Sequence, residues 1–428
     1  MADNDRIYTG SIVRNEFLYR SWKDFSHVIR IMARVKEPVS GETLYYAVQE
    51  SVKRYPYFCR KVIRRGGEYE ITLNEAPVPV YEGTAGICLG SREACGHYLA
   101  VCYDGCNIYF DIYHSMADAQ GAIPWAKTVL YLYLNKKYAL SLPKDNIRLP
   151  GEGFLRGETE DPYEKLCIRR DMAPVYEPAP IKNFEPDDRF AQSSERVRYH
   201  IRVSEPDIIK LAKTKDGSPT VVSAYFLKET VKKLFPERGG LPIVCNVSHS
   251  LRDICQGPEN YHDQVSVLSL RYNDKTDAFP MDKQFSVGRG QLIIQSDEAN
   301  MLYDIRKKAE FAEKLDALKT VDEKRMLYQN SMEQVVSYPE TCTVSYPGKI
   351  RWGAIEEYLD EIFASCRALI SPIMTSLIPL NGWFYYCFVQ KHDTPLYSGI
   401  FVRLLREAGV RAEVIRREKE ELSTVYLP

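Results

Sequence analysis

The chain has 428 residues, which is too long for one ordinary hydrophobic core, so we expect two domains of roughly 150 to 220 residues each. Hydrophobic residues make up 45% and charged residues 27% of the sequence, a balance that excludes disorder on the scale of the whole chain. The 57 basic residues nearly cancel the 58 acidic ones, so no overall charge draws the molecule toward nucleic acid or anionic lipid, and any phosphate site must be local.

Membrane and metal signals are missing from the sequence. The longest apolar runs, such as 122–134, are too short or too interrupted to span a bilayer, and the polar N-terminus has no signal-peptide core. We therefore expect a cytoplasmic protein without a membrane span. The 11 cysteines have no paired CxxC spacing, so the sequence predicts neither a zinc site nor a disulfide framework, and we expect no bound metal.

Strands and helices alternate in the first part of the chain. Residues 27–36 predict a strand, and Ser40 is a suitable N-cap for an amphipathic helix that ends before Pro56. Gly66 and Gly67 stand between two apolar runs and predict a hairpin, because glycine reaches positive φ without steric cost. Residues 107–113 predict a strand, followed by a turn and a helix that ends near residue 134. We expect residues 1–145 to form a first lobe.

A stretch rich in proline, glycine and charge follows, and it predicts a linker or crossover over residues 146–195. Regular patterns return near Val197, with Ser204 as an N-cap, a helix over 219–235 and a strand over 241–247. The rest predicts a charged helical stretch over 298–334, an amphipathic helix over 355–363, a strand over 383–389 and a helix over 396–407. We expect residues 196–428 to form a second lobe, and mixed α/β or α+β layers in both.

Two histidines stand in an HxxxD spacing directly after an apolar strand. These are His114 with Asp118, and His249 with Asp253. A histidine at the end of a strand faces a cleft more often than one inside the strand, and its neutral imidazole can take a proton at cellular pH. Spacing alone does not separate the two pairs, and a structural role is open for each of them.

The segment YHSMADAQG at residues 113–121 resembles the HxxxD motif of the chloramphenicol acetyltransferase-like acyltransferases. This superfamily also holds condensation domains, alcohol acetyltransferases and polyketide-associated acyltransferases. The resemblance covers most of the chain: the segment from HVIRIMARVK to RYPYFCRKV looks like the family's opening strand, helix and hairpin. CNVSHSLRDICQGPEN looks like its arginine motif, and TVSYPGKI like its Ser-Asn-x-Gly turn.

This resemblance implies a role for each matching residue. His114 matches the general base, and Asp118 matches an aspartate that turns away from the base toward an arginine, here Arg252. We take Gly121 as the glycine of the turn, although the family usually places it directly after the aspartate. Relatives often carry two adjacent histidines where this chain has Tyr113 and His114. Ser345 and Tyr346 are candidates to stabilise an oxyanion or contact substrate, or else they only shape the turn.

The family fold implies two similar lobes with an interlobe tunnel, and an acyl group that moves from a thioester to an alcohol or amine. No bound cofactor is expected, because acyl-coenzyme A or an acyl-phosphopantetheine group acts as co-substrate. The partners implied are a small-molecule acceptor and the thioester, with an acyl carrier protein as an alternative donor. Two other functions stay open: condensation of carrier-bound substrates to an amide or ester, and non-catalytic binding by a retained fold.

Overall fold

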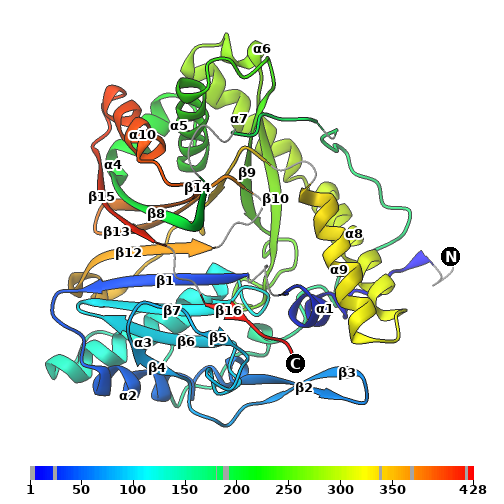
Figure 1. Ribbon diagram of the computed structural model, residues 1–428, viewed down its shortest axis with the longest axis vertical. Coiled ribbons are helices and arrows are strands. Elements are labelled where there is room, and N and C mark those ends of the chain that lie inside the picture. Colours follow the sequence, from blue (N-terminus) through cyan, green and yellow to red (C-terminus); the bar gives the residue numbers. More distant parts are fainter. Residues whose placement is uncertain are drawn as a thin grey trace.

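The computed structural model describes residues 5–22, 27–179, 181–186, 192–336, 340–366, 371–419 and 423–428. Within these residues, two large mixed β-sheets are flanked by helices and make two lobes, one above the other in Figure 1. No helix in the described part of the chain has the length and apolar composition that crossing a bilayer requires.

The first lobe is built on a five-stranded sheet with the order β12-β1-β7-β6-β4. β1 pairs antiparallel with β7 on one side and with β12 on the other. A separate hairpin, β2 and β3, turns at Gly66 and Gly67, whose φ angles are 58° and 90°, as the sequence predicts. The strands and the first helix of this lobe are α1 (Ile12–Tyr19), β1 (Val28–Val35), β2 (Arg60–Arg65), β3 (Glu68–Leu73), β4 (Val80–Glu82), β5 (Cys88–Leu89), β6 (Leu99–Asp104), β7 (Asn107–Tyr113) and β12 (Leu359–Cys366).

Two capped helices, α2 (Gly41–Ser51) and α3 (Ala119–Tyr138), pack against each other and cover this sheet. The Ser40 hydroxyl accepts a hydrogen bond from the Thr43 backbone N–H at 3.3 Å, which confirms the predicted N-cap. Asp118 caps α3 in the same way. This capping role fixes Asp118 at the point where the strand that ends at Tyr113 becomes a helix.

The second lobe is built on a seven-stranded sheet with the order β10-β9-β11-β13-β14-β8-β15, packed on one side by α4, α5, α7 and α10. Ser204 caps α4 as predicted, accepting from the Asp207 N–H at 3.4 Å. The elements are β8 (Gln192–Ser204), α4 (Glu205–Thr214), α5 (Pro219–Leu234), β9 (Ile243–Ser250), β10 (Val265–Tyr272), α6 (Asp274–Asp277), α7 (Met281–Gln295), β11 (Cys342–Ser345), β13 (Ile373–Leu380), β14 (Trp383–His392), α10 (Leu396–Glu407) and β15 (Ala412–Lys419).

The prediction of an amphipathic helix over residues 355–363 is wrong. A short 3-10 helix, η4 (Gly353–Tyr358), is followed by β12, whose residues 362–366 are all buried. In so short a run, the spacing of apolar residues fits a helix and a strand. The strand forms because these residues pair with β1, which is close to the N-terminus. β12 therefore carries the chain from the second sheet to the edge of the first (Figure 1).

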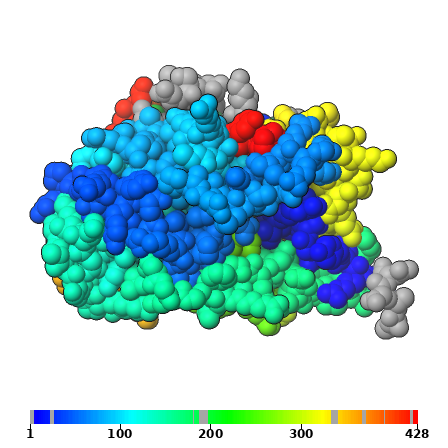
Figure 2. Space-filling view, turned by 90° about the horizontal axis from the view of Figure 1, so that it is seen from below, coloured from blue at the N-terminus to red at the C-terminus, as the bar shows by residue number. Residues whose placement is uncertain are grey.

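The end of the chain also returns to the first lobe. β16 (Thr424–Val425) pairs in parallel with β5, and Figure 2 shows C-terminal residues exposed among residues of the N-terminal part. The charged stretch over 298–334 forms two helices, α8 (Glu298–Asp316) and α9 (Val321–Val336), which both contact α1. The described part of the predicted linker contains one short 3-10 helix, η3 (Arg156–Glu158). Residues 180 and 187–191 of the linker lie outside the described residues.

Candidate active site

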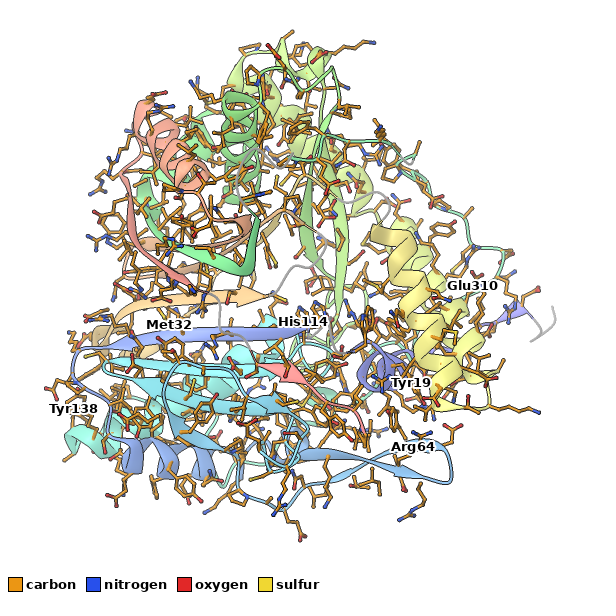
Figure 3. All side chains as sticks on the ribbon, in the orientation of Figure 1. Tyr19, Met32, Arg64, His114, Tyr138 and Glu310 are labelled. Atoms are coloured by element: carbon orange, nitrogen blue, oxygen red, sulfur yellow. The ribbon has the colours of Figure 1, made fainter. Side chains whose placement is uncertain are left out.

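The register of the first sheet places His114 at the junction of the lobes. Val28 of β1 lies opposite Tyr113 of β7, and the His114 backbone N–H donates to the His27 carbonyl at 2.7 Å. The chain then turns, with the Met116 N–H bonded to the Tyr113 carbonyl at 2.9 Å, and enters α3. The His114 side chain is thus held at a strand end, and Figure 3 shows it between the two lobes.

A cavity with an empty volume of about 690 Å³, part of it open to solvent, lies against His114. Both lobes contribute to its lining. The first lobe supplies residues of β1, β12 and the start of α3, and the second lobe supplies the ends of β9, β11 and β13. The lining residues that matter below are Ile29, His114, Asp118, Gln120, Ser248, His249, Ser345, Tyr346, Cys366 and Ser376.

Asp263 lies behind the imidazole of His114. Its Oδ2 atom is 3.2 Å from His114 Nδ1 and 3.2 Å from a guanidinium nitrogen of Arg20. The His114 ring N–H is not aimed well enough at this oxygen to make a regular hydrogen bond, so we describe the contact as electrostatic. A carboxylate on the Nδ1 side favours the tautomer that carries its proton there, which leaves Nε2 to accept a proton.

The same carboxylate decides the direction in which the pKa of the His114 imidazole is shifted. Burial lowers the pKa of His114, but the attraction of Asp263 outweighs it, so the pKa is raised from its usual value. Burial raises the pKa of Asp263, but His114 and then Arg20 hold it well below its usual range. In the folded protein, Asp263 is therefore ionised at neutral pH.

His249 lines the same cavity in a different electrostatic setting. Burial lowers its pKa, and the opposing effect of Asp253 is too weak to reverse the shift. The Asp253 side chain is exposed, whereas Asp263 behind His114 is buried. Spacing alone does not distinguish the two histidines, but their nearest carboxylates do. His114 has the buried Asp263, from outside its own HxxxD pair, whereas, among the described residues, His249 has only the exposed Asp253 acting on its pKa.

Both carboxylate oxygens of Asp118 accept hydrogen bonds from neighbouring parts of the fold. Its Oδ2 accepts from Arg252 at 2.6 Å and from the Gln264 backbone N–H at 3.2 Å. Its Oδ1 accepts from Arg252 at 2.8 Å and from the Gly121 N–H at 2.8 Å. Four donors thus hold both oxygens, and the structure brings Asp118 and Arg252 together as a buried pair that joins α3 to the loop after β9.

Gly121 sits in the first turn of α3 against the backbone of Tyr261. A Cβ atom built on Gly121 falls 2.0 Å from the Tyr261 carbonyl oxygen, a distance that no side chain can occupy. The close approach lets the helix start against the second-lobe loop that carries Asp263. The residue therefore acts through packing distance, since its φ lies outside the left-handed region.

Ser345 and Tyr346 lie across the cavity from His114, at the end of β11. Ser345 pairs with Ser376, and Val344 pairs with Val247, so Ser248, Ser345 and Ser376 stand in a row on three neighbouring strands. Burial, with a smaller effect from Glu205, raises the pKa of Tyr346 to about 12, so its hydroxyl stays a hydrogen-bond donor. The structure thus brings both residues to the cavity.

Gln120 links the two lobes at the cavity wall, and sequence reasoning did not single it out. Its Nε2 donates to the Pro347 carbonyl at 2.8 Å, and its Oε1 accepts from Ser250 at 3.0 Å and from Arg252 at 2.9 Å. Asp263 was missed too, because it lies 149 positions from His114 in no recognised motif. No local signal marks either residue, since their partners come from distant segments.

A second cavity continues on the other side of Gln120 and Pro347, which line both. Its empty volume is about 1330 Å³, part of it open to solvent. Basic side chains outnumber acidic ones in its wall. The charged lining residues are Arg54, Lys127, Arg148, Lys349 and Arg351, with Glu152, Glu158 and Glu259. Burial and the neighbouring Arg148 lower the pKa of Lys127 to about 8.

Neither a protein-family model nor a curated protein matches the sequence. Solved structures do match its fold. Polyketide synthase associated protein 5 from Mycobacterium tuberculosis aligns with a TM-score of 0.61 and 12% identity, over 94% of this chain and 96% of that one. TRI101 of F. sporotrichioides, complexed with coenzyme A and T-2, aligns with a TM-score of 0.55 and 11% identity, over 91% and 96%.

The epimerization domain from the third module of tyrocidine synthetase B aligns with a TM-score of 0.52 and 9% identity, over 94% of this chain and 96% of that domain. Identities this low concern the fold alone. The chain has the two-lobed α/β fold of chloramphenicol acetyltransferase-like acyltransferases and condensation domains, which confirms the fold that its sequence resemblance predicts.

Proposed function

We propose that the chain is an acyltransferase that moves an acyl group from a thioester to an alcohol or amine, with His114 as general base. The observation that carries the proposal is the pairing of His114 Nδ1 with buried Asp263 at 3.2 Å, while the ring borders a cavity shared by both lobes. A base held by a carboxylate on one nitrogen and open to substrate on the other is the arrangement that proton abstraction needs.

In this mechanism the acceptor hydroxyl or amine binds within hydrogen-bonding reach of His114 Nε2. The base takes the acceptor's proton as its oxygen or nitrogen attacks the thioester carbonyl. The tetrahedral intermediate then collapses, the C–S bond breaks, and the imidazolium returns the proton to the leaving thiolate. Asp263 stabilises the transient positive charge on the imidazolium without itself accepting a proton. No acyl-enzyme forms.

We assign the developing oxyanion to donors on the second-lobe side of the cavity. Tyr346 and the row of Ser248, Ser345 and Ser376 line this space. One well-placed donor contributes about 3 to 4 kcal/mol to an acyl-transfer transition state. Replacing Tyr346 by Phe should therefore lower kcat by about 10²- to 10³-fold while leaving donor KM nearly unchanged.

For the donor we propose acyl-coenzyme A, entering through the second cavity. Arg54 and Arg148 of its wall pair with Glu158 and Glu259, so we assign the phosphate groups to Lys349 and Arg351. Gln120 and Pro347 line both cavities, and we place the pantetheine arm past these two residues toward His114. TRI101, which shares the fold, is complexed with coenzyme A. A carrier-bound phosphopantetheine is the alternative, and it shares the arm but lacks the nucleotide.

A panel of acyl-coenzyme A esters with acceptor alcohols and amines, read as free thiol, tests the proposal. We expect thiol release that needs an acceptor and falls at least about 10²-fold in His114→Ala, the scale of a lost general base. His249→Ala, matched in residue type and cavity, should lose much less. The reverse order in folded variants refutes the choice of base, and turnover with only an acylated carrier protein moves the function to condensation on carriers.

A further inference from the structure

Three side chains of different strands converge beside the candidate base. The residues His27, His114 and Cys366 each offer one ligand atom, and these atoms lie within 4.8 Å of one another. The sheet register explains the convergence. His27 precedes Val28 and His114 follows Tyr113, so the two histidines lie next to the Val28–Tyr113 pair on neighbouring strands. Cys366 pairs with Ile29, and Ile29 is two residues from His27, so Cys366 and His27 lie on the same face of the sheet.

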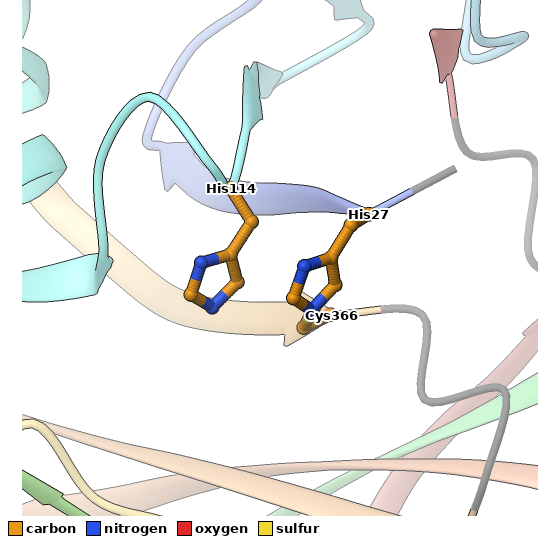
Figure 4. Close-up of side chains that lie close together, drawn as sticks. All are labelled: His27, His114 and Cys366. Atoms are coloured by element: carbon orange, nitrogen blue, oxygen red, sulfur yellow. The ribbon is translucent and has the colours of Figure 1, made fainter. Parts of the chain in front are cut away.

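The two imidazoles lie face to face, with ring centroids 4.3 Å apart and planes 7° apart. Figure 4 shows the rings parallel, with Cys366 beside the ring of His27. Both rings thus lie at the same end of the first sheet, with one ligand atom of each within 4.8 Å of the Cys366 sulfur. Neutral imidazole is the form that binds metal ions.

We propose that His27, His114 and Cys366 form a Zn²⁺ site, and that Zn²⁺ bound there blocks His114. Two imidazole nitrogens and one thiolate are ligands that zinc prefers, and three protein ligands leave one tetrahedral position for water. The inhibitory half of this inference rests on the proposed function, whereas the binding half does not.

The surroundings of His114 support coordination through Nε2. Its Nδ1 faces Asp263 at 3.2 Å, and a carboxylate on the far nitrogen of a zinc-bound imidazole fixes the ring and strengthens it as a ligand. Tetrahedral zinc with bonds of about 2.0 to 2.3 Å needs ligand atoms roughly 3.3 to 3.8 Å apart, so the parallel rings must tilt toward each other and toward Cys366.

Two consequences follow for the base. A zinc ion bound to His114 Nε2 uses the lone pair with which His114 would otherwise take a proton from the substrate alcohol or amine. The ion also fills space next to the cavity. Binding also deprotonates the Cys366 thiol and releases that proton to solvent, so the affinity for zinc rises with pH. Zinc and the acyl acceptor therefore compete for one site.

Cobalt(II) spectroscopy on the full chain tests the binding without any turnover. We expect one equivalent of Co²⁺ to give a thiolate charge-transfer band and the visible absorption of a tetrahedral ion, both removed by Zn²⁺. Cys366→Ala should abolish the thiolate band, and His27→Ala should weaken binding at least about tenfold. Cys102→Ala, another buried cysteine of the same sheet, and His249→Ala, another cavity histidine, are matched controls that should bind normally.

Absence of the thiolate band in the wild-type chain, or its persistence in Cys366→Ala, overturns the site. Cys366→Ser is a nearly isosteric second variant if the alanine variant does not fold. For inhibition, acylated product is measured by chromatography, since free thiols also bind zinc. We expect Zn²⁺ to stop turnover reversibly, and Cys366→Ala to need at least about tenfold more Zn²⁺. A cobalt site without thioester turnover would refute the proposed function and leave the metal site standing.

Discussion

Replacing Asp263 by Asn tests the arrangement that carries the proposed function. The change removes one negative charge 3.2 Å from His114 Nδ1 and leaves the Arg20 guanidinium beside the ring. Without the carboxylate, burial and Arg20 both act to lower the pKa of His114. A base must be unprotonated to work, so the rise of kcat/KM with pH should move to lower pH, and the plateau above it should fall.

The size of the effect follows from the contact. Two unit charges 3.2 Å apart attract by about 5 kcal/mol at an effective dielectric constant of about 20, before the cost of burying them is subtracted. In serine proteases the equivalent substitution lowers kcat by about 10⁴-fold, because the histidine takes the wrong tautomer. The contact here is less well aligned, so we expect a loss nearer to about 10²-fold.

The assay is kcat/KM against pH with an acyl-coenzyme A donor, alongside thermal melting of each variant. Asp253→Asn is the matched control, because it removes the carboxylate of the other HxxxD pair and should leave the profile in place. An Asp263→Asn profile that keeps its position, or moves to higher pH, would refute the role assigned to Asp263. A lower plateau with no shift would mean that Asp263 only holds the fold.

Three further predictions follow from the site. Gly121→Ala should destabilise the protein by at least about 1 to 3 kcal/mol in denaturant unfolding, because the added methyl group meets a backbone carbonyl at 2.0 Å. Asp118→Ala and Arg252→Met should each cost about 3 to 5 kcal/mol by stranding a buried charge, and the double variant should recover part of that loss. Lys349→Ala with Arg351→Ala should raise KM for acyl-coenzyme A about tenfold with little change in kcat, and an unchanged KM would argue against donor entry at the second cavity.

Elements defined by local chemistry were predictable from the sequence, and elements defined by pairing were not. The cap at Ser40 and the hairpin at Gly66 and Gly67 depend on residues within a few positions, and both are where the sequence predicts them. β12 is different, because Ile362 and Phe363 suit a helix face and a strand equally well. Only β1, more than 320 positions away, selects the strand.

The candidate site divides in the same way. The sequence singles out His114 as a candidate because a strand end, a turn and a helix cap are encoded within a dozen residues. Asp263 and Cys366 reach His114 through the loop after β9 and through β12, so no spacing in the sequence connects them to it. A resemblance to a family carries over the motif residues but says nothing about such chain-specific neighbours.

The carboxylates of Asp118 and Asp263, both near His114, differ in their hydrogen bonds, and we therefore assign them different roles. Asp118 accepts four hydrogen bonds, so its charge is fully used in joining α3 to the second lobe, and it has no oxygen left for an imidazole. Asp263 has no donor on Oδ1 among the residues that the structure describes, and its Oδ2 is shared between His114 and Arg20. A carboxylate with unused accepting capacity can strengthen its contact as the imidazole gains a proton, whereas a saturated one cannot. In the proposed mechanism, the motif's aspartate therefore builds the site, and the charge that responds to the imidazolium comes from Asp263, a residue outside the motif.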